Sequence, residues 1–314
     1  MKRKVVRHGD STLTISLPSK WAKANSIKPG QLLNLEQTDC GIFVSSNENY
    51  PIEKTEITLS WDKEWYIQRI LRHLYTYGYD EVSVNYAKKE QLLLLRKGLE
   101  SLPGFEIGES NPKICKIRCV GSLESTEYDD TVKKILWLIL SQFDYLIEDC
   151  GVKNPIMHDE VNELFKTISK LINLCRRLIN KRPPYDSTIS KYAYRFLTSL
   201  MNIASFLIYT YDYSKKMNKL QLSQSEMELV TKTRGFYYQL LMAYQNLNVE
   251  KTKQFFSERE EMFDVVLELF REKNPVITHY FLDILKELSS IGNLVLILRL
   301  SEENAIKNKW KTAE

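Results

Sequence analysis

The chain has 314 residues, 43% hydrophobic and 27% charged, a balance typical of folded globular protein with about two domains. Its 44 Lys and Arg residues face 40 Asp and Glu residues, and the net charge of +4 excludes a protein that coats nucleic acid over its whole surface. The longest strongly apolar runs, such as 135–140 and 294–298, are much shorter than the roughly 20 residues of a membrane-spanning helix. No signal-peptide pattern opens the chain, so we expect a cytoplasmic protein without membrane insertion.

The basic excess is gathered at the start of the chain. Only one acidic side chain, Asp10, precedes Glu36 there, and the first seven residues contain four cations: Lys2, Arg3, Lys4 and Arg7. Such a cluster is either a solvated terminus or the electrostatic footprint of a polyanion-binding surface. The residues around it favour the second interpretation.

Residues 1–47 have the pattern of a small domain with short strands around a short helix. A Gly-Asp turn at 9–10 precedes an alternation of apolar and polar residues over 12–17, which is typical of a half-buried strand. Pro18 and Ser19 open a helix, and the Lys-Pro-Gly turn at 28–30 leads into further strands. A domain of this size has little core of its own.

This domain resembles the AbrB/SpoVT family of swapped-hairpin DNA-binding domains, through Arg7, Gly9, Ser11 and the stretches 13–18, 28–30 and 41–44. The resemblance implies half of a β-barrel that interleaves with a second copy, and therefore a homodimer that presents its basic strand and loop to double-stranded DNA. It assigns DNA contact to Lys2, Arg3, Lys4, Arg7, Ser11, Thr12, Lys20 and Lys23. Arg7 is the candidate reader of bases, because base edges are read by forked donors. The family also includes antitoxins that pair with toxins, so transcription is not the only output it allows.

Residues 52–121 alternate between strand and helix patterns. Strand patterns lie at 55–59, 81–86, 105–107 and 114–120, and helical spacing lies at 65–74 and 91–102. The resulting βαβαββ order predicts a small α/β module with helices on one face of a sheet. The chain as a whole is therefore predicted to be a multidomain α+β protein.

Strand signals vanish after residue 121, and residues 122–305 are predicted to form six long helices. The breaks lie at 151–155, 182–186, 213–224, 246–249 and 273–275. Apolar residues at three- and four-residue spacing, clearest over 161–179, predict a helical bundle. The break at 213–224 divides it into two groups of three helices, which indicates either a duplicated three-helix unit or one irregular bundle. Residues 306–314 are predicted to be a polar tail.

A second resemblance rests on the segment 159–165, the apolar stripe behind it and the Asn-Ile-Ala sequence at 202–204. Together with the two helix triplets, these features resemble the PhoU family of phosphate-uptake regulators. The combination of an AbrB-like head and a PhoU-like body resembles archaeal-type phosphate uptake regulators. This implies that the helical domain receives a signal linked to phosphate supply.

PhoU-like proteins often bind iron or zinc through acidic pairs spaced four residues apart. Here the matching positions hold residues that are not strong metal ligands: Tyr194, Thr198, Ser289 and Asn293. Glu260 with Asp264 and Asp283 with Glu287 have the spacing elsewhere and are only weak candidates. We therefore predict no bound metal and no cofactor.

No nucleotide-binding loop, hydrolase elbow or zinc-protease motif occurs, and the four histidines lie in four different segments, so no enzyme is predicted. The expected function is a DNA-binding transcriptional regulator that responds to phosphate supply. The alternative is an adaptor that does not bind DNA and regulates a phosphate transporter or signalling partner through protein contacts. A metal-storing bundle is a third, less favoured, interpretation.

Overall fold

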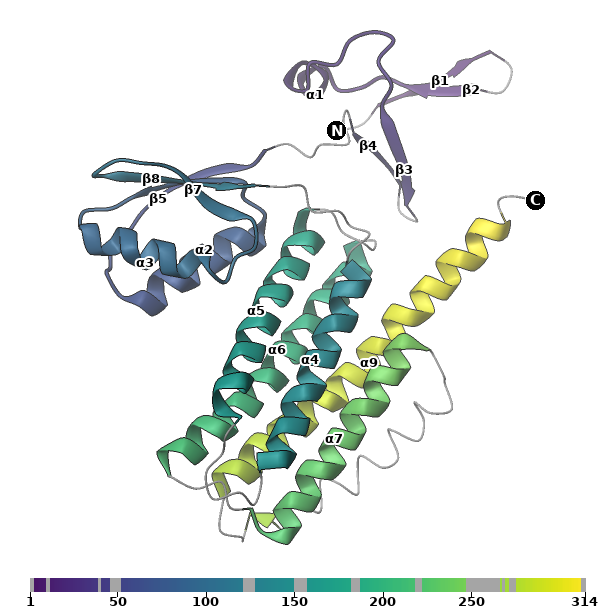
Figure 1. Ribbon diagram of the computed structural model, residues 1–314. Coiled ribbons are helices and arrows are strands. Elements are labelled where there is room, and N and C mark those ends of the chain that lie inside the picture. The colour runs from purple at the N-terminus through teal and green to yellow at the C-terminus, as the bar shows by residue number, and fades with distance from the viewer. Residues whose placement is uncertain are drawn as a thin grey trace. The chain divides into compact units, whose positions relative to one another are not determined.

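The computed structural model shows a mixed α+β protein that is mostly helical, with small sheets (Figure 1). Its contacts divide the chain into two compact units, Met1–Pro51 and Ile52–Glu314. The residues that the structure describes are 3–9, 12–38, 41–45, 52–120, 128–149, 157–181, 187–217, 222–246, 266, 269–270 and 275–311.

The first unit contains two separate antiparallel strand pairs and one short helix. β1 (Val5–His8) pairs with β2 (Thr12–Ile15), and β3 (Asn34–Thr38) pairs with β4 (Gly41–Ser45). The helix α1 (Ser19–Ala24) follows Pro18, whose extended backbone ends the preceding strand. In the β1–β2 pair, Val5 lies opposite Ile15 and Arg7 lies opposite Leu13, so these four residues share one face.

The apolar side chains of this unit are largely exposed, which corrects the prediction of a half-buried strand at 12–17. Leu13 is 70% exposed and Ile15 60% exposed. Val5, Leu35 and Ile42 are exposed to a similar extent. The alternation is present, but no second layer covers the apolar face within the described residues of this unit.

The second unit begins with an α/β module in the expected βαβαββ order. Its elements are β5 (Lys54–Thr58), α2 (Glu64–Tyr77), β6 (Glu81–Asn85), α3 (Lys89–Leu99), β7 (Phe105–Ser110) and β8 (Ile114–Cys119). The sheet order is β5-β6-β8-β7, with β5 and β6 parallel and the other neighbours antiparallel. Both helices lie on one side of the sheet (Figure 1).

The module has its own hydrophobic core between the sheet and these helices. Val82 lies opposite Ile117 and Val84 opposite Cys115, and all four are buried on the same sheet face. The helices cover that face with side chains at helical spacing: Ile67, Leu71 and Tyr75 from α2 and Leu95 from α3.

The helical part of the unit contains α4 (Tyr128–Asp149), α5 (His158–Lys181), α6 (Ser187–Lys216), α7 (Gln224–Gln245) and α9 (Pro275–Lys311). The fifth predicted helix, between the breaks at 246–249 and 273–275, falls mostly outside the described residues. α4 packs against α7, and α6 packs against α9 (Figure 1). The first helices of the two expected triplets are thus in contact, and so are the last.

Two helix ends differ from the prediction. α6 continues to Lys216, into the predicted break at 213–224, because Tyr211 and Ser214 are buried and no Pro or Gly interrupts the turn. α9 continues to Lys311, so the predicted polar tail is helical over most of its length. None of the helices in the described ranges combines the length and apolar character that crossing a membrane requires.

Candidate functional site

The basic side chains assigned to DNA contact lie on the exposed surface of the first unit. Arg3, Lys4 and Arg7 are exposed on and before β1, and Thr12 is exposed at the start of β2. Lys20 and Lys23 are exposed on α1. Lys2 and Ser11 lie outside the described residues.

The β1–β2 hairpin combines cationic and apolar groups on one ribbon. Arg7 shares a face with Val5, Leu13 and Ile15, and the Thr14 hydroxyl on the other face donates to the Val6 carbonyl oxygen at 3.1 Å. A two-stranded ribbon is narrow enough to enter the major groove of DNA. Its exposed cations, Lys4 and Arg7, are therefore open to phosphates or base edges, and Arg7 shares its face of the ribbon with the apolar side chains.

The module and the helical part of the second unit are joined by a buried arginine on α5. The Arg177 guanidinium donates to Asp80 Oδ1 at 2.6 Å and to the carbonyl oxygens of Tyr75 and Tyr79 at 2.8 Å each. Its Cζ atom also lies 5.0 Å from the centroid of the Tyr75 ring. The arginine therefore binds both the end of α2 and the two residues that precede β6.

The same face of α5 makes further polar contacts with the module. Lys181 pairs with the second oxygen of Asp80, and Asn180 Nδ2 donates to the Thr76 carbonyl oxygen at 2.6 Å. Asn173 Nδ2 reaches the Ser101 carbonyl oxygen at 3.4 Å. Because these residues recur at helical spacing, α5 presents one polar stripe to the module. We name this set of contacts between α5 and the module, made by Asn173, Arg177, Asn180 and Lys181, the joint.

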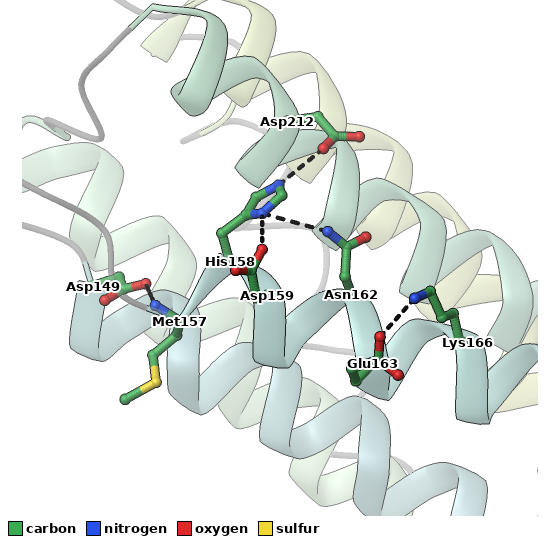
Figure 2. A network of polar contacts seen from close by, with 8 residues as sticks. All are labelled: Asp149, Met157, His158, Asp159, Asn162, Glu163, Lys166 and Asp212. Atoms are coloured by element: carbon green, nitrogen blue, oxygen red, sulfur yellow. Dashed lines mark hydrogen bonds and ion pairs between the residues drawn. The ribbon is translucent and has the colours of Figure 1, made fainter.

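A network at the start of α5 connects three helices (Figure 2). His158 Nε2 lies 3.2 Å from Asp212 Oδ1 on α6, and His158 Nδ1 lies 3.3 Å from Asp159 Oδ1. Asp149, at the end of α4, accepts from the Met157 backbone N–H at 2.9 Å. Carboxylates at a helix N-terminus stabilise its unpaired N–H groups, so this network fixes the start of α5 against α4 and α6.

The weak metal candidates on α9 are occupied by protein partners. Glu287 accepts from Asn202 Nδ2 at 2.6 Å and lies 3.4 Å from Arg195 Nη2. Asp283 pairs with Lys286 at 3.0 Å and lies 3.4 Å from His279. Glu260 and Asp264 lie outside the described residues. Among the described residues, no three His, Cys, Asp or Glu side chains gather into a metal-binding group.

Two tryptophans, Trp61 before α2 and Trp65 in its first turn, are largely exposed to solvent. Trp61 and Trp65 are 55% and 54% exposed, and their ring centroids lie 6.0 Å apart in an edge-to-face arrangement. Tyr66 completes the aromatic cluster. Exposed aromatic side chains of this kind are enriched at protein interfaces.

The sequence prediction did not include the joint. Its signal is a row of polar residues on α5, at 173, 177, 180 and 181, beside the apolar stripe of that helix. The positions matched to metal sites in PhoU-like proteins hold another contact instead, since Arg176 Nη2 donates to Thr198 Oγ1 at 3.1 Å. No family model, curated protein or solved structure matches the chain.

Proposed function

We propose that the chain is a DNA-binding transcriptional regulator that acts as a homodimer through its N-terminal unit. The observation that carries the proposal is the β1–β2 hairpin, where exposed Arg7 lies directly opposite Leu13, which is 70% exposed. An exposed cation suits the phosphates and bases of DNA. An exposed apolar side chain beside it suits a second copy of the same hairpin.

The homodimer is supported by the apolar side chains that a single copy leaves in water. Val5, Leu13 and Ile15 share one face of the first strand pair, and Leu35 and Ile42 share one face of the second. Burying a side chain of this size contributes about 1.5–3 kcal/mol. A second copy that packs on these apolar side chains, with the Arg7 guanidinium extending past the edge of the contact, would supply the missing layer and close the strand pairs into a swapped-hairpin β-barrel of the AbrB/SpoVT kind.

For the helical part we propose two three-helix units of the PhoU kind, which receive a signal linked to phosphate supply. Contacts of α4 with α7 and of α6 with α9 support this division, because they pair helices with the same place in each triplet. The signal reaches the module through the joint, since Arg177 and its neighbours connect α5 to α2 and β6.

The test of DNA binding is fluorescence anisotropy of a labelled duplex pool with the full chain, titrated between 50 and 200 mM salt. Six to ten phosphate contacts would reduce the affinity by about 10³–10⁵ over this range. The variant Arg3→Glu/Arg7→Glu should lose binding. The matched control, Lys89→Glu/Lys113→Glu, reverses two exposed charges of the α/β module and should retain it. Equal binding by both variants, or no binding at low salt, would refute the proposal.

The adaptor function is the second candidate, favoured by the exposed pair Trp61 and Trp65. Here the N-terminal unit serves only for dimerisation, and the chain acts by protein contacts with a phosphate transporter or signalling protein. Cells that carry the chain without residues 1–47 distinguish the two functions. If the truncated chain loses both DNA binding and the phosphate response, the regulator is supported. If it keeps the full phosphate response without any DNA affinity, the adaptor is supported.

A further inference from the structure

Three arginines and a histidine gather beside the joint. Arg69, Arg72 and His73 are spaced three and four residues apart, so they lie on one face of α2. Arg176 comes from α5, which packs against α2. Arg72 and Arg176 are partly buried, whereas Arg69 and His73 are exposed. The cluster therefore has a half-buried base and a rim open to solvent.

The charges of this cluster lack carboxylate partners, in contrast to the next arginine along α5. Arg177 is paired with Asp80, whereas Arg176 donates to the neutral Thr198 hydroxyl and lies 5.2 Å over the Tyr194 ring. Within the described residues, the guanidinium groups of Arg69 and Arg72 have no hydrogen bond or ion pair to protein. Among the described residues the buried Nε of Arg176 has no acceptor, which is also true of Arg177 Nε, so the contrast between the two lies in the carboxylate alone.

The electrostatics of the cluster indicate uncompensated charge. Burial lowers the pKa of Arg72, and the charge of Arg69 lowers it further. Burial likewise lowers the pKa of Arg176, Tyr194 opposes this shift, and Arg72 adds a smaller lowering. Burial and these three arginines together lower the pKa of His73. Arginine stays protonated under all ordinary conditions, so the repulsion is relieved by a counter-charge rather than by proton loss.

We propose that Arg72 and Arg176 form the base of a binding site for a small multivalent oxyanion, with Arg69 and His73 at its rim. Guanidinium groups present forked N–H donors that match the oxygens of phosphate, sulfate or a phosphoryl group. A multivalent anion can neutralise more than one guanidinium at once. The two base arginines are half-buried on α2 and α5, which pack against each other, and this favours a small ligand over a polymer.

Such a site would connect the α/β module to the helical bundle. Its base arginines come from α2 and α5, and Thr198 adds α6. A bound oxyanion would hold these three helices together and strengthen the joint. The inference goes beyond DNA binding and does not depend on it, because the site lies in the second unit.

The test is isothermal titration calorimetry and thermal unfolding of the full chain without DNA. The probes are inorganic phosphate, sulfate, adenosine 5′-monophosphate and chloride, at matched ionic strength. Phosphate or sulfate should bind and raise the Tm, and chloride should not. A preference for adenosine monophosphate over both would identify a phosphoryl group on a carrier as the ligand. Arg72→Gln/Arg176→Gln should weaken binding by about tenfold or more for each charged contact removed.

The matched control is Arg96→Gln/Lys170→Gln, which removes two exposed cations from α3 and α5 and should bind as the unmodified chain does. Because the double variant at the base alters packing, the exposed Arg69→Gln provides a second variant that should weaken binding several-fold with an unchanged Tm in the absence of ligand. Equal oxyanion affinity in all variants, or no affinity for any multivalent probe, would overturn the inference. A loss of DNA affinity in these variants without oxyanion binding would also overturn it, in favour of a nucleic-acid surface.

Discussion

Arg177 Nη2 on α5 lies 2.6 Å from Oδ1 of Asp80, the residue before β6, and the two side chains are only 2% and 19% exposed. The pair joins residues 97 positions apart in the chain. A buried ion pair is stable only when its geometry is good and its remaining donors are satisfied. Here two backbone carbonyls accept from Nη1 of the same guanidinium and Lys181 shares the carboxylate, while the buried Nε has no acceptor among the described residues. The pair therefore specifies one orientation of the module on α5.

Replacing Arg177 with Met should destabilise the protein by about 3–5 kcal/mol, because removal of one partner leaves a buried charge without compensation. The control is Arg234→Met, which breaks the more exposed ion pair with Asp144 and should cost less than about 1 kcal/mol. Urea unfolding followed by circular dichroism measures both. Equal losses in the two variants would show that the joint does not depend on Arg177.

Two glycine substitutions, one beside the joint and one in α7, test the backbone geometry at these positions. Gly78 has φ 118°, and an added Cβ would lie 2.9 Å from Cγ of Lys181, so Gly78→Ala should be clearly destabilising. Gly235 lies within α7 with nothing near an added Cβ, so Gly235→Ala should stabilise by about 0.5–1 kcal/mol. Thermal unfolding of the two variants should give shifts of opposite sign. Shifts of the same sign would contradict the geometry at one of the two positions.

Leu13→Glu should dissociate the proposed homodimer, because it places a charge on the apolar face that the second copy covers. Leu93→Glu is the control, since Leu93 on α3 is 67% exposed and Leu13 is 70% exposed. Light scattering coupled to size-exclusion chromatography gives the mass of each variant. We expect a monomer for Leu13→Glu and a dimer for the control. A dimer in both would remove the apolar hairpin face from the interface.

The stability of the protein should fall as the pH drops below the ordinary pKa of histidine, 6.5, in part because of His73. Burial and the neighbouring Arg72, Arg69 and Arg176 lower the pKa of His73 in the folded state. Between the folded-state and unfolded-state pKa values of His73, the unfolded chain binds more protons than the folded chain, so protonation favours unfolding. This loss of stability disappears as the pH rises above 6.5. His73→Gln should reduce this pH dependence. An NMR titration should also show that sulfate raises the pKa of His73, and an unchanged value in sulfate would contradict an oxyanion beside it.

Much of the secondary structure could be predicted because its signal is local. Alternation places Val82 and Val84 on the buried face of β6, and the spacing of Ile168, Ile172 and Cys175 marks the buried face of α5. Burial in the first unit could not be predicted in the same way. Leu13 alternates as a half-buried residue does, but no layer within the described part of its unit covers it.

The joint and the cationic cluster depend on contacts that local periodicity does not contain. The spacing of Arg69, Arg72 and His73 is visible in the sequence, but their lack of acidic partners follows only from the packing of α2 against α5. The contrast between Arg176 and Arg177 is also invisible in the sequence, where the two are adjacent and chemically identical. Only their different partners, Asp80 for Arg177 and Thr198 for Arg176, separate a paired arginine from one without a carboxylate.

We expect the basic hairpin to contact DNA bases as part of a two-fold dimer. Selection of bound sequences from a random duplex pool by the full chain tests it most directly, with Arg7→Gln and Lys89→Gln selected in parallel. We predict an enriched motif with two-fold symmetry for the unmodified chain and for Lys89→Gln, and loss of that motif for Arg7→Gln. A pool without enrichment, or the same motif in all three selections, would contradict the claim.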